Sequence, residues 1–342
     1  MATVSLPDQM RSAQWTTAPM ESSLIVSETT PLPRDAHSLP ENSALVKMSY
    51  ASINPVDYKA PEFGFFRYMA MGKGPWIPAC DYAGTVVTTN LPHVKPGDKV
   101  AGCTAIPKFG TLAEYAVIEG AENVAKLPEG VDLKDAATLA VAAQTAMQSI
   151  EPYVEEGFKV IIYGASGGTG TFGIQIAKIM GCIVTAVCSG PKVELCKRLG
   201  ADDVIDYKST DVIQELKKGG LQYDLIVDNV AVGGPIYTQS HHYLKKTGRY
   251  VTIAAGPNLS SLIGMVQILA LPAFLGGGRR RSVYVGRKPD AEELVKLAGW
   301  IKDGKLKPFI EKVYHLDEVA DAFKQLKSGR TQGKLVVKVS GK

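Results

Sequence analysis

The chain has 342 residues, of which 45% are apolar and 21% are charged, and its formal net charge is +4. This composition is typical of a soluble globular protein, it excludes a disordered or fibrous chain, and the length predicts two domains. The 38 basic and 34 acidic side chains are nearly balanced, and the only compact basic run, Arg279 to Arg281, is too short to indicate nucleic-acid binding. We therefore expect a small-molecule partner and no nucleic acid.

Three further features bear on the compartment. The five cysteines lie far apart without a C-x-x-C pair, which indicates buried free thiols in a reducing environment. The first 15 residues contain no apolar stretch of the signal-peptide type, so we expect a cytoplasmic protein. The most apolar run, residues 261–277, is interrupted by Pro272 and ends in glycines, short of the roughly 20 residues that a membrane span needs. We expect no membrane span there.

The first 126 residues consist of short apolar runs separated by Pro and Gly. Their alternation and β-branched content predict strands of a barrel or sandwich at 44–53, 82–89, 98–102 and 112–120. An Ala-rich helix follows, and Asp132 or Asp135 could cap it.

From Val160 onward, predicted strands and helices alternate. The strands are 159–164, 182–188, 202–207, 223–230, 249–255 and 282–286, and amphipathic helices at 170–181 and 191–200 separate the first three. Helices are also expected at 291–306 and 316–329, with a closing strand at 334–339. Alternating strands and helices predict an α/β fold with a doubly wound parallel sheet.

The stretch VIIYGASGGTGTFGIQIAK (160–178) carries two motifs. Gly164 to Gly168 spells the G-x-S-x-G elbow of a hydrolase, with Ser166 as nucleophile and Asp228 and His315 as possible partners. The same stretch, as strand, Gly-rich turn and helix, would hold a dinucleotide pyrophosphate on Ser166, Gly167 and the N–H groups of Gly168 and Thr169. Gly170 and Gly173 continue into the helix, where a close helix-to-strand contact or a phosphate needs the absence of a side chain, and this favours the dinucleotide.

The end of the next strand indicates which dinucleotide is bound. An acidic side chain there would bind the ribose 2′-hydroxyl of NAD, but the sequence has Ser189 and Lys192 and no carboxylate at this tip. A hydroxyl and a cation suit the 2′-phosphate of NADP, and Tyr207 could add a second hydroxyl. The sequence therefore predicts NADPH as the cofactor.

The strings YGASGGTGTFGIQIAK, LGADDVIDY, GRYVTIA and QGKLVVKV, together with INPVDYK in the first half, resemble the medium-chain dehydrogenase/reductase superfamily, in its zinc-free quinone oxidoreductase-like branch. The resemblance covers nearly the whole chain. It implies a GroES-like β-rich catalytic domain (1–128 and 287–342), an inserted Rossmann domain that binds NADPH (129–286), a cleft between them, and a homodimer.

The resemblance also implies that the protein contains no metal. Zinc-dependent relatives place a cysteine where this chain has Asn54 or a neighbour, and a His-Glu pair where it has Asp81 and Tyr82. A lone carboxylate without an imidazole is not a catalytic zinc set, which usually has three protein ligands. The lobe of four closely spaced cysteines is missing as well, since Cys103 stands alone.

Without a Lewis acid, the acceptor must take up hydride readily, as an apolar quinone or the activated C=C bond of an α,β-unsaturated carbonyl does. The developing enolate-like oxygen then needs only hydrogen-bond donors and a later proton. The donor candidates are Asn54, Tyr58 and Lys59, although Asp57 could simply cap the next turn and Tyr58 could pack. Further predicted cofactor contacts match family positions or end strands of the sheet; they are Thr145, Asn229, Val230, Ala254, Ala255, Gly333 and Lys334.

Two alternatives to a quinone or enone reductase stay open. Trans-acting enoyl reductases of the same superfamily share segments like INPVDYK and act on carrier-bound acyl chains. Some zinc-free relatives bind NADPH without turnover, as sensors or structural proteins.

Overall fold

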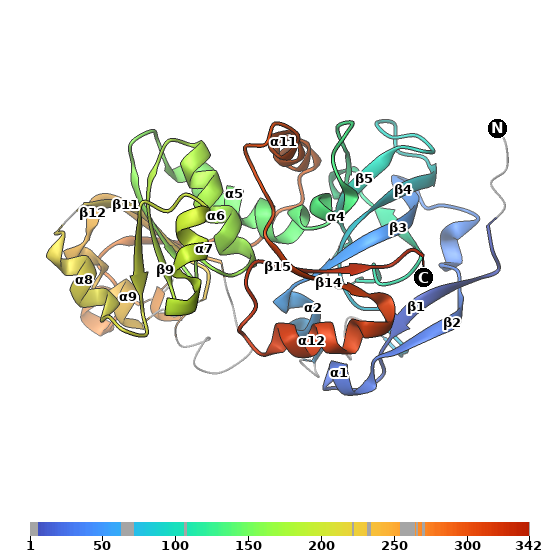
Figure 1. Cartoon of the computed structure of the whole chain (residues 1–342), viewed down its shortest axis with the longest axis horizontal. Coiled ribbons are helices and arrows are strands. Elements are labelled where there is room, and N and C mark those ends of the chain that lie inside the picture. The colour runs from blue at the N-terminus through green and yellow to red at the C-terminus, as the bar shows by residue number, and fades with distance from the viewer. Residues whose placement is uncertain are drawn as a thin grey trace. The chain divides into compact units, whose positions relative to one another are not determined.

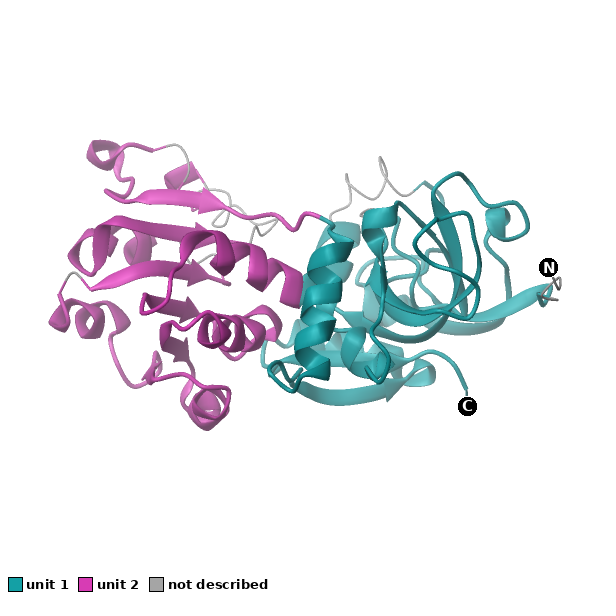
Figure 2. Cartoon of the chain, turned by 90° about the horizontal axis from the view of Figure 1, so that it is seen from above, with its two compact units in different colours: residues 1–142, 289–342 teal, residues 143–288 magenta. Residues whose placement is uncertain are grey.

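The computed structural model describes residues 6–62, 72–105, 108–220, 222–230, 234–253, 264, 266–268 and 271–341 (Figure 1). The chain divides into two compact units (Figure 2). Unit 1 comprises residues 1–142 and 289–342, and unit 2 comprises residues 143–288. The boundaries predicted from the sequence, after residues 128 and 286, lie earlier in the chain, because the Ala-rich helical stretch up to Ala142 belongs to unit 1.

Unit 1 is built on one large sheet whose strands run in the order β14-β15-β3-β4-β5-β7, with β6 also pairing with β3. Its strands are β3 (Ser43–Ile53), β4 (Asp81–Thr89), β5 (Lys99–Cys103), β6 (Tyr115–Glu119), β7 (Val124–Lys126), β14 (Ile310–His315) and β15 (Lys334–Lys338), and a separate pair is formed by β1 (Gln9–Gln14) and β2 (Ile25–Pro31). Its helices are α1 (Met20–Ser23), α2 (Pro55–Glu62), α4 (Leu133–Ala136), α11 (Ala291–Lys302) and α12 (Val319–Lys327).

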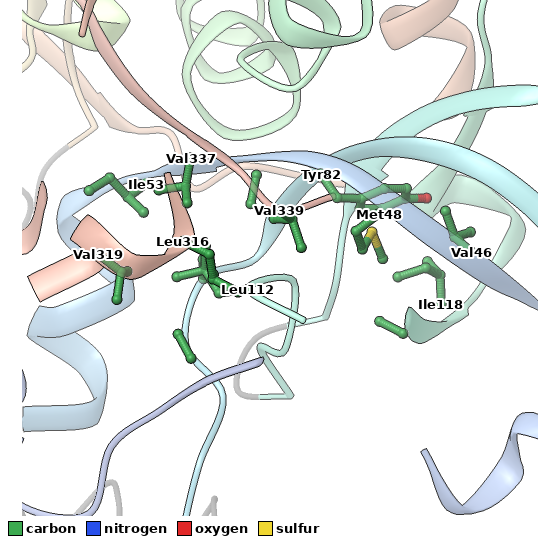
Figure 3. Packing of buried hydrophobic residues seen from close by; sticks show 14 of the residues in the cluster. Val46, Met48, Ile53, Tyr82, Leu112, Ile118, Leu316, Val319, Val337 and Val339 are labelled. Carbon is green, nitrogen blue, oxygen red and sulfur yellow. The ribbon is translucent and has the colours of Figure 1, made fainter. Parts of the chain in front are cut away.

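The C-terminal segment completes the core of unit 1. Strand β15 pairs antiparallel with β3 in a register that sets Leu335 opposite Ile53. Its side chains join those of β3 and β4 in one buried cluster, in which Val337 lies beside Ile53 and which also contains Met48 and Tyr82 (Figure 3). Amphipathic α12 adds Val319 to the same cluster.

Unit 2 contains six parallel strands in the order β10-β9-β8-β11-β12-β13. They are β8 (Lys159–Tyr163), β9 (Ile183–Cys188), β10 (Asp203–Asp206), β11 (Tyr223–Asp228), β12 (Leu244–Thr252) and β13 (Arg281–Tyr284), connected through α6 (Gly168–Ile179), α7 (Val193–Arg198), α8 (Val212–Lys218) and α9 (Gly234–Thr238), and preceded by α5 (Gln144–Ile150). The strand order reverses between β8 and β11, and ligands of such sheets bind at this switch point, outside the carboxyl ends of the strands.

The predicted fold class is confirmed: a GroES-like β-rich unit accompanies a parallel, doubly wound Rossmann-like sheet. Asp132, one of the two proposed caps, accepts a hydrogen bond from the backbone N–H of Lys134 at the start of α4. All five cysteines are free and buried, as expected. In the part of the chain that the structure describes, no helix is both long and apolar enough to cross a membrane.

Candidate active site

The Gly-rich turn between β8 and α6 has the shape of an anion cradle. Gly164 has a φ of 70°, and a Cβ there would lie 2.5 Å from Cγ2 of Val230. The N-cap of α6 is Gly167, which makes no side-chain capping hydrogen bond. The first N–H groups of a helix have no intrahelical partner, so those of Gly168 and Thr169 remain for an anion, next to the buried Ser166.

The segment after β11 reaches the same turn. Asn229 donates from its backbone N–H and from Nδ2 to the carbonyl oxygen of Tyr163, at 3.2 and 2.9 Å. The next residue, Val230, is 54% exposed, and its N–H donates to Asp228. Gly164, Asn229 and Val230 therefore meet at the switch point, whereas the predicted contacts Ala254 and Ala255 lie outside the described residues.

Ser189, Lys192 and Tyr207 come together because β9 and β10 are parallel neighbours. Ser189 follows β9, and its carbonyl accepts from the N–H of Lys192 at 2.8 Å. Tyr207 follows β10, donates its N–H to the carbonyl of Cys188 at 3.1 Å, and is 45% exposed. The three predicted phosphate contacts thus lie at one end of the sheet.

Asp206, a carboxylate that was not predicted for this end of the sheet, also lies here. Its Oδ1 accepts from the backbone N–H of Lys208 at 2.9 Å and its Oδ2 accepts from Ser209 Oγ at 3.0 Å; the first of these bonds is the main reason why the pKa of Asp206 lies below its usual value. A Cβ on Gly190 would lie 2.7 Å from Asp206 Oδ2. The signal was present in the string DYKS, in which an acid two and three residues before N–H and hydroxyl groups is typical of an Asx turn.

A cavity of about 310 Å³ opens at the same edge of unit 2. Two tyrosines line it together with two polar and four apolar residues around the start of α8 and α9. The lining residues are Tyr163, Tyr207, Thr210, Asp211, Val212, Ile213, Pro235 and Ile236. Thr145, another predicted contact, is almost fully buried on α5 in the same unit.

The hydrolase interpretation finds no support at the proposed partners of Ser166. The carboxylate of Asp228 accepts from Tyr250 Oη at 2.7 Å and from the N–H of Val230 at 3.0 Å. His315 belongs to unit 1, where it forms a capping box with Glu318 at a short 3-10 helix. Asp228 and His315 therefore each have a local structural role, and neither observation supports a catalytic triad with Ser166.

In unit 1, Asn54 and Lys334 lie in a buried polar cluster. The Nζ of Lys334 donates to Asn54 Oδ1, and Asn54 Nδ2 donates to Asp81 Oδ2 at 2.8 Å. Asp57 is also fully buried, and its Oδ2 accepts from the backbone N–H of Asn54 at 2.6 Å, so it caps α2. Burial and then the charge of Asp81 raise the pKa of Asp57 to about 7. We call these residues, with Cys80 and Cys103, the Lys334 cluster.

The other two catalytic candidates, Tyr58 and Lys59, do not belong to the Lys334 cluster. Tyr58 packs against the core of unit 1, with Lys327 Nζ 5.2 Å from the centre of its ring, and burial raises its pKa. Lys59 is partly exposed on α2. Gly333 has a φ of 59° and approaches the backbone of Phe309 closely, which places Lys334 at the start of β15. Their roles toward substrate and cofactor stay predictions.

One group in the described part of the chain has the spacing of metal ligands. The ligand atoms of Cys80, Asp81 and Cys103 lie within 4.8 Å of one another. However, all three side chains are fully buried, and three protein ligands are one fewer than a structural zinc site usually has.

The position of Lys334 also disagrees with a metal ion. Its Nζ lies 3.8 Å from Asp81 Oδ2. A metal ion bound to Asp81 would therefore lie close to this ammonium. Two like unit charges about 4 Å apart repel by roughly 4 kcal/mol at an effective dielectric constant of about 20, and the repulsion between the ammonium and a dication at that distance is about twice as large. With Lys334 in place, the donor set does not fit zinc, and the metal-free prediction stays a prediction.

Comparisons with known proteins agree with this architecture. Residues 40–129 match the family model described as alcohol dehydrogenase GroES-like domain, and residues 199–337 match the one described as zinc-binding dehydrogenase. Trans-enoyl reductase pgmF of Aspergillus terreus is 37% identical, with 98% of each chain covered. The human mitochondrial NAD(P)H oxidoreductase RTN4IP1 is 34% identical, with 87% of this chain and 82% of that protein covered.

A solved structure of a quinone oxidoreductase is also similar to this chain over nearly its whole length. The quinone oxidoreductase from Coxiella burnetii superimposes with a TM-score of 0.83 and 28% identity, over 97% of this chain and 99% of that one. The chain belongs to the medium-chain dehydrogenase/reductase superfamily, in its quinone oxidoreductase-like branch.

Proposed function

We propose that this protein is an NADPH-dependent oxidoreductase that transfers hydride to a quinone or to the activated C=C bond of an α,β-unsaturated carbonyl. The observation that carries the proposal is the edge of unit 2, where the glycine turn before α6, the segment after β11 and the group Ser189, Lys192 and Tyr207 share one end of the sheet. The names of the human and Coxiella relatives support the same reaction class.

In this proposal the residues of the chain mainly bind and orient. The N–H groups of Gly168 and Thr169 hold the pyrophosphate, and Ser189, Lys192 and Tyr207 hold the 2′-phosphate. Asp206 lies at the same end of the sheet, and its lowered pKa keeps it ionised near neutral pH, so its charge opposes an anion that Lys192 attracts. When bound, the nicotinamide supplies the hydride. A hydrogen-bond donor would stabilise the oxygen of the acceptor. Asn54 is the first candidate, and its Nδ2 would have to exchange its bonds to Asp81 or to the carbonyl of Ser52 for this role.

A second candidate function is a trans-acting enoyl reductase that works on carrier-bound acyl chains. It is supported by the match to trans-enoyl reductase pgmF, which extends over 98% of both chains. The two functions share the cofactor site and differ in the acceptor, so a comparison of acceptors separates them.

The test is NADPH oxidation measured by absorbance with phenanthrenequinone, an alkenal and a crotonyl pantetheine thioester, each repeated with NADH. We expect turnover with NADPH to exceed turnover with NADH. Lys192→Ala removes a charge-assisted contact of about 1.5–3 kcal/mol, so it should raise the KM for NADPH roughly 10- to 100-fold and leave that for NADH unchanged.

Lys197→Ala is the matched control, because Lys197 is an exposed lysine of α7 whose partner is Glu194. It should change neither KM. The thioester as the best acceptor would favour the second candidate. NADPH binding without turnover on any acceptor would contradict both enzymes and favour the sensor, and equal KM values for NADPH in wild type and Lys192→Ala would contradict the phosphate site.

A further inference from the structure

The ammonium of Lys334 is enclosed by unit 1. The side chain is 3% exposed, and Nζ donates to Asn54 Oδ1 and, at 3.4 Å, to the carbonyl of Ile53. This location follows from the register, because Leu335 pairs with Ile53 and so sets Lys334 beside Asn54. The first residue of the C-terminal strand therefore places a buried cation in the interior of unit 1.

Every other ionisable group of the Lys334 cluster is an acid or a thiol. Asp57, Cys80, Asp81 and Cys103 are each 0% exposed; burial lowers the pKa of Lys334, and the charges of these four groups act in the opposite direction, towards the protonated form. Oδ1 of Asp57 is buried without a hydrogen-bond partner. The thiols of Cys80 and Cys103 and the carboxylate of Asp81 are ligands that a metal ion would bind, yet the cation beside Asp81 is an ammonium.

The ammonium also determines how the amide of Asn54 is oriented. The amide oxygen accepts from Lys334, and the amide nitrogen donates to Asp81 Oδ2 at 2.8 Å. If the amide were flipped, its nitrogen would face the ammonium and its oxygen would face the carboxylate, so both hydrogen bonds would be lost. Lys334 and Asp81 together hold one orientation.

We propose that Lys334 is a positioning residue that replaces a metal ion: its ammonium neutralises Asp81 among Cys80 and Cys103, and it orients Asn54 at the start of α2. The structural part of this inference is independent of the proposed function. Its effect on hydride transfer rests on the proposed function.

The first experiment asks whether removal of the ammonium creates a metal site. The full chain, as wild type and as Lys334→Ala, is titrated with Co²⁺ under reducing conditions. We expect Lys334→Ala to bind one Co²⁺ with a thiolate-to-cobalt charge-transfer band, because the ligand atoms of Cys80, Asp81 and Cys103 lie within 4.8 Å of one another and the ammonium beside Asp81 is then gone. Wild type should show no such band.

Two controls assign the band. Cys103→Ser in the Lys334→Ala background should abolish it. Cys188 and Cys196, which contact each other in unit 2, are present in all variants, so wild type reports any cobalt bound there. A charge-transfer band in wild type, or a folded Lys334→Ala that binds no cobalt, would overturn the proposal.

If Lys334→Ala does not fold, a double-mutant cycle decides. Lys334→Met should lower the thermal midpoint by removing the cation beside the buried Asp81, and adding Asp81→Asn should recover most of that loss. Additive losses in the double variant would mean that the ammonium and the carboxylate are not coupled, and the proposal would be wrong.

Kinetics test the positioning role. Lys334→Met should lower kcat and leave the Kd for NADPH unchanged, whereas a direct contact of Lys334 with the cofactor would weaken NADPH binding and contradict positioning through Asn54. If wild type turns over no acceptor, the proposed function fails while the cobalt result still stands.

Discussion

Gly170 and Gly173 lie one turn apart on α6, yet only one of them needs to lack a side chain. A Cβ on Gly170 would lie 2.7 Å from the backbone Cα and carbonyl carbon of Ala165, and closer still to the carbonyl oxygen of Gly164. A Cβ on Gly173 would meet only side-chain methyl groups of Ile150 and Ile162, at 3.6 Å or more. The sequence predicted a close approach at both positions, and the structure shows it at Gly170 alone.

We therefore expect opposite effects from the two alanine substitutions. Gly170→Ala should lower the free energy of unfolding of unit 2 by about 1–3 kcal/mol and weaken NADPH binding, because α6 must move away from the turn. Gly173→Ala should be neutral or stabilise by up to about 1 kcal/mol, since alanine favours the helix. Urea unfolding and NADPH titration measure both effects, and equal losses in the two variants would contradict this explanation.

At the residue scale, patterns along the chain predicted local groups better than distant ones. Ser189, Lys192 and Tyr207 were predicted because each ends or follows a strand of one parallel sheet, and their grouping then follows from strand order. The pairing of Asn54 with Lys334 joins residues 280 positions apart through the register of β15 on β3. No short motif contains that register, so it could not be predicted.

Three helices of unit 1 are joined by one lysine. Lys327 at the end of α12 forms ion pairs with Glu21 of α1 and Glu62 of α2, and all three side chains are about four-fifths buried (Figure 1). Burial raises the pKa of Glu21, but its hydrogen bonds and the charges of Lys327 and Lys324 outweigh burial, so the pKa lies below 4.5. Burial likewise lowers the pKa of Lys327, but both glutamates raise it above 10.5.

These pKa shifts determine how stability depends on pH. A carboxylate with a lowered pKa stabilises the fold above its unfolded pKa, and an ammonium with a raised pKa does so below its own, so the ion pairs act between about pH 4.5 and 10.5. Lys327→Met should cost on the order of 1–3 kcal/mol at pH 7, and the difference from wild type should shrink as the pH falls below 4.5.

Urea unfolding at several pH values measures this difference. Lys108→Met is the matched control, since Lys108 of unit 1 pairs with Glu119 and both side chains are more than two-fifths exposed. It should cost about 0–1 kcal/mol at any of these pH values. A Lys327→Met loss that stays constant down to pH 3 would show that packing, and not charge, accounts for its effect.

At the element scale, strands with strong periodicity were predicted and weaker ones were missed. The six strands of unit 2 all fall within or overlap their predicted ranges, because a buried parallel strand is a short run of apolar β-branched residues. Strands β1, β2, β7 and β14 were not predicted. Polar residues interrupt the apolar pattern of the first two, as the buried Ser12 in β1 and the buried Thr30 in β2 illustrate.

At the scale of the whole molecule, the open edge of the parallel sheet bears on assembly. Strand β13 pairs on one side with β12, and no other described strand pairs with its second side. Large apolar side chains are exposed near this strand in the chain, with Phe274 at 85%, Leu275 at 60% and Tyr284 at 42%. An unpaired edge with exposed apolar side chains favours association with a second strand edge, and these features agree with the homodimer that the family resemblance implies.

Light scattering with size-exclusion chromatography tests the dimer. Wild type should have about twice the monomer mass of 36.6 kDa, and the double variant Phe274→Asp, Leu275→Asp should have the monomer mass. Ile25→Asp is the control, because Ile25 is as exposed as Leu275 but lies on β2 of unit 1. A monomeric wild type would contradict the homodimer.

The order of the strands also has a consequence for synthesis of the protein. All six strands of unit 2 have left the ribosome once residue 284 is free, so its sheet can form while the rest of the chain is still being translated. Unit 1 begins earlier but cannot be completed until β14 and β15 emerge, because β15 covers β3 and brings Lys334 to Asp81. Until then Asp81 cannot meet Lys334, so we expect the unit whose synthesis begins first to be the last to complete its fold.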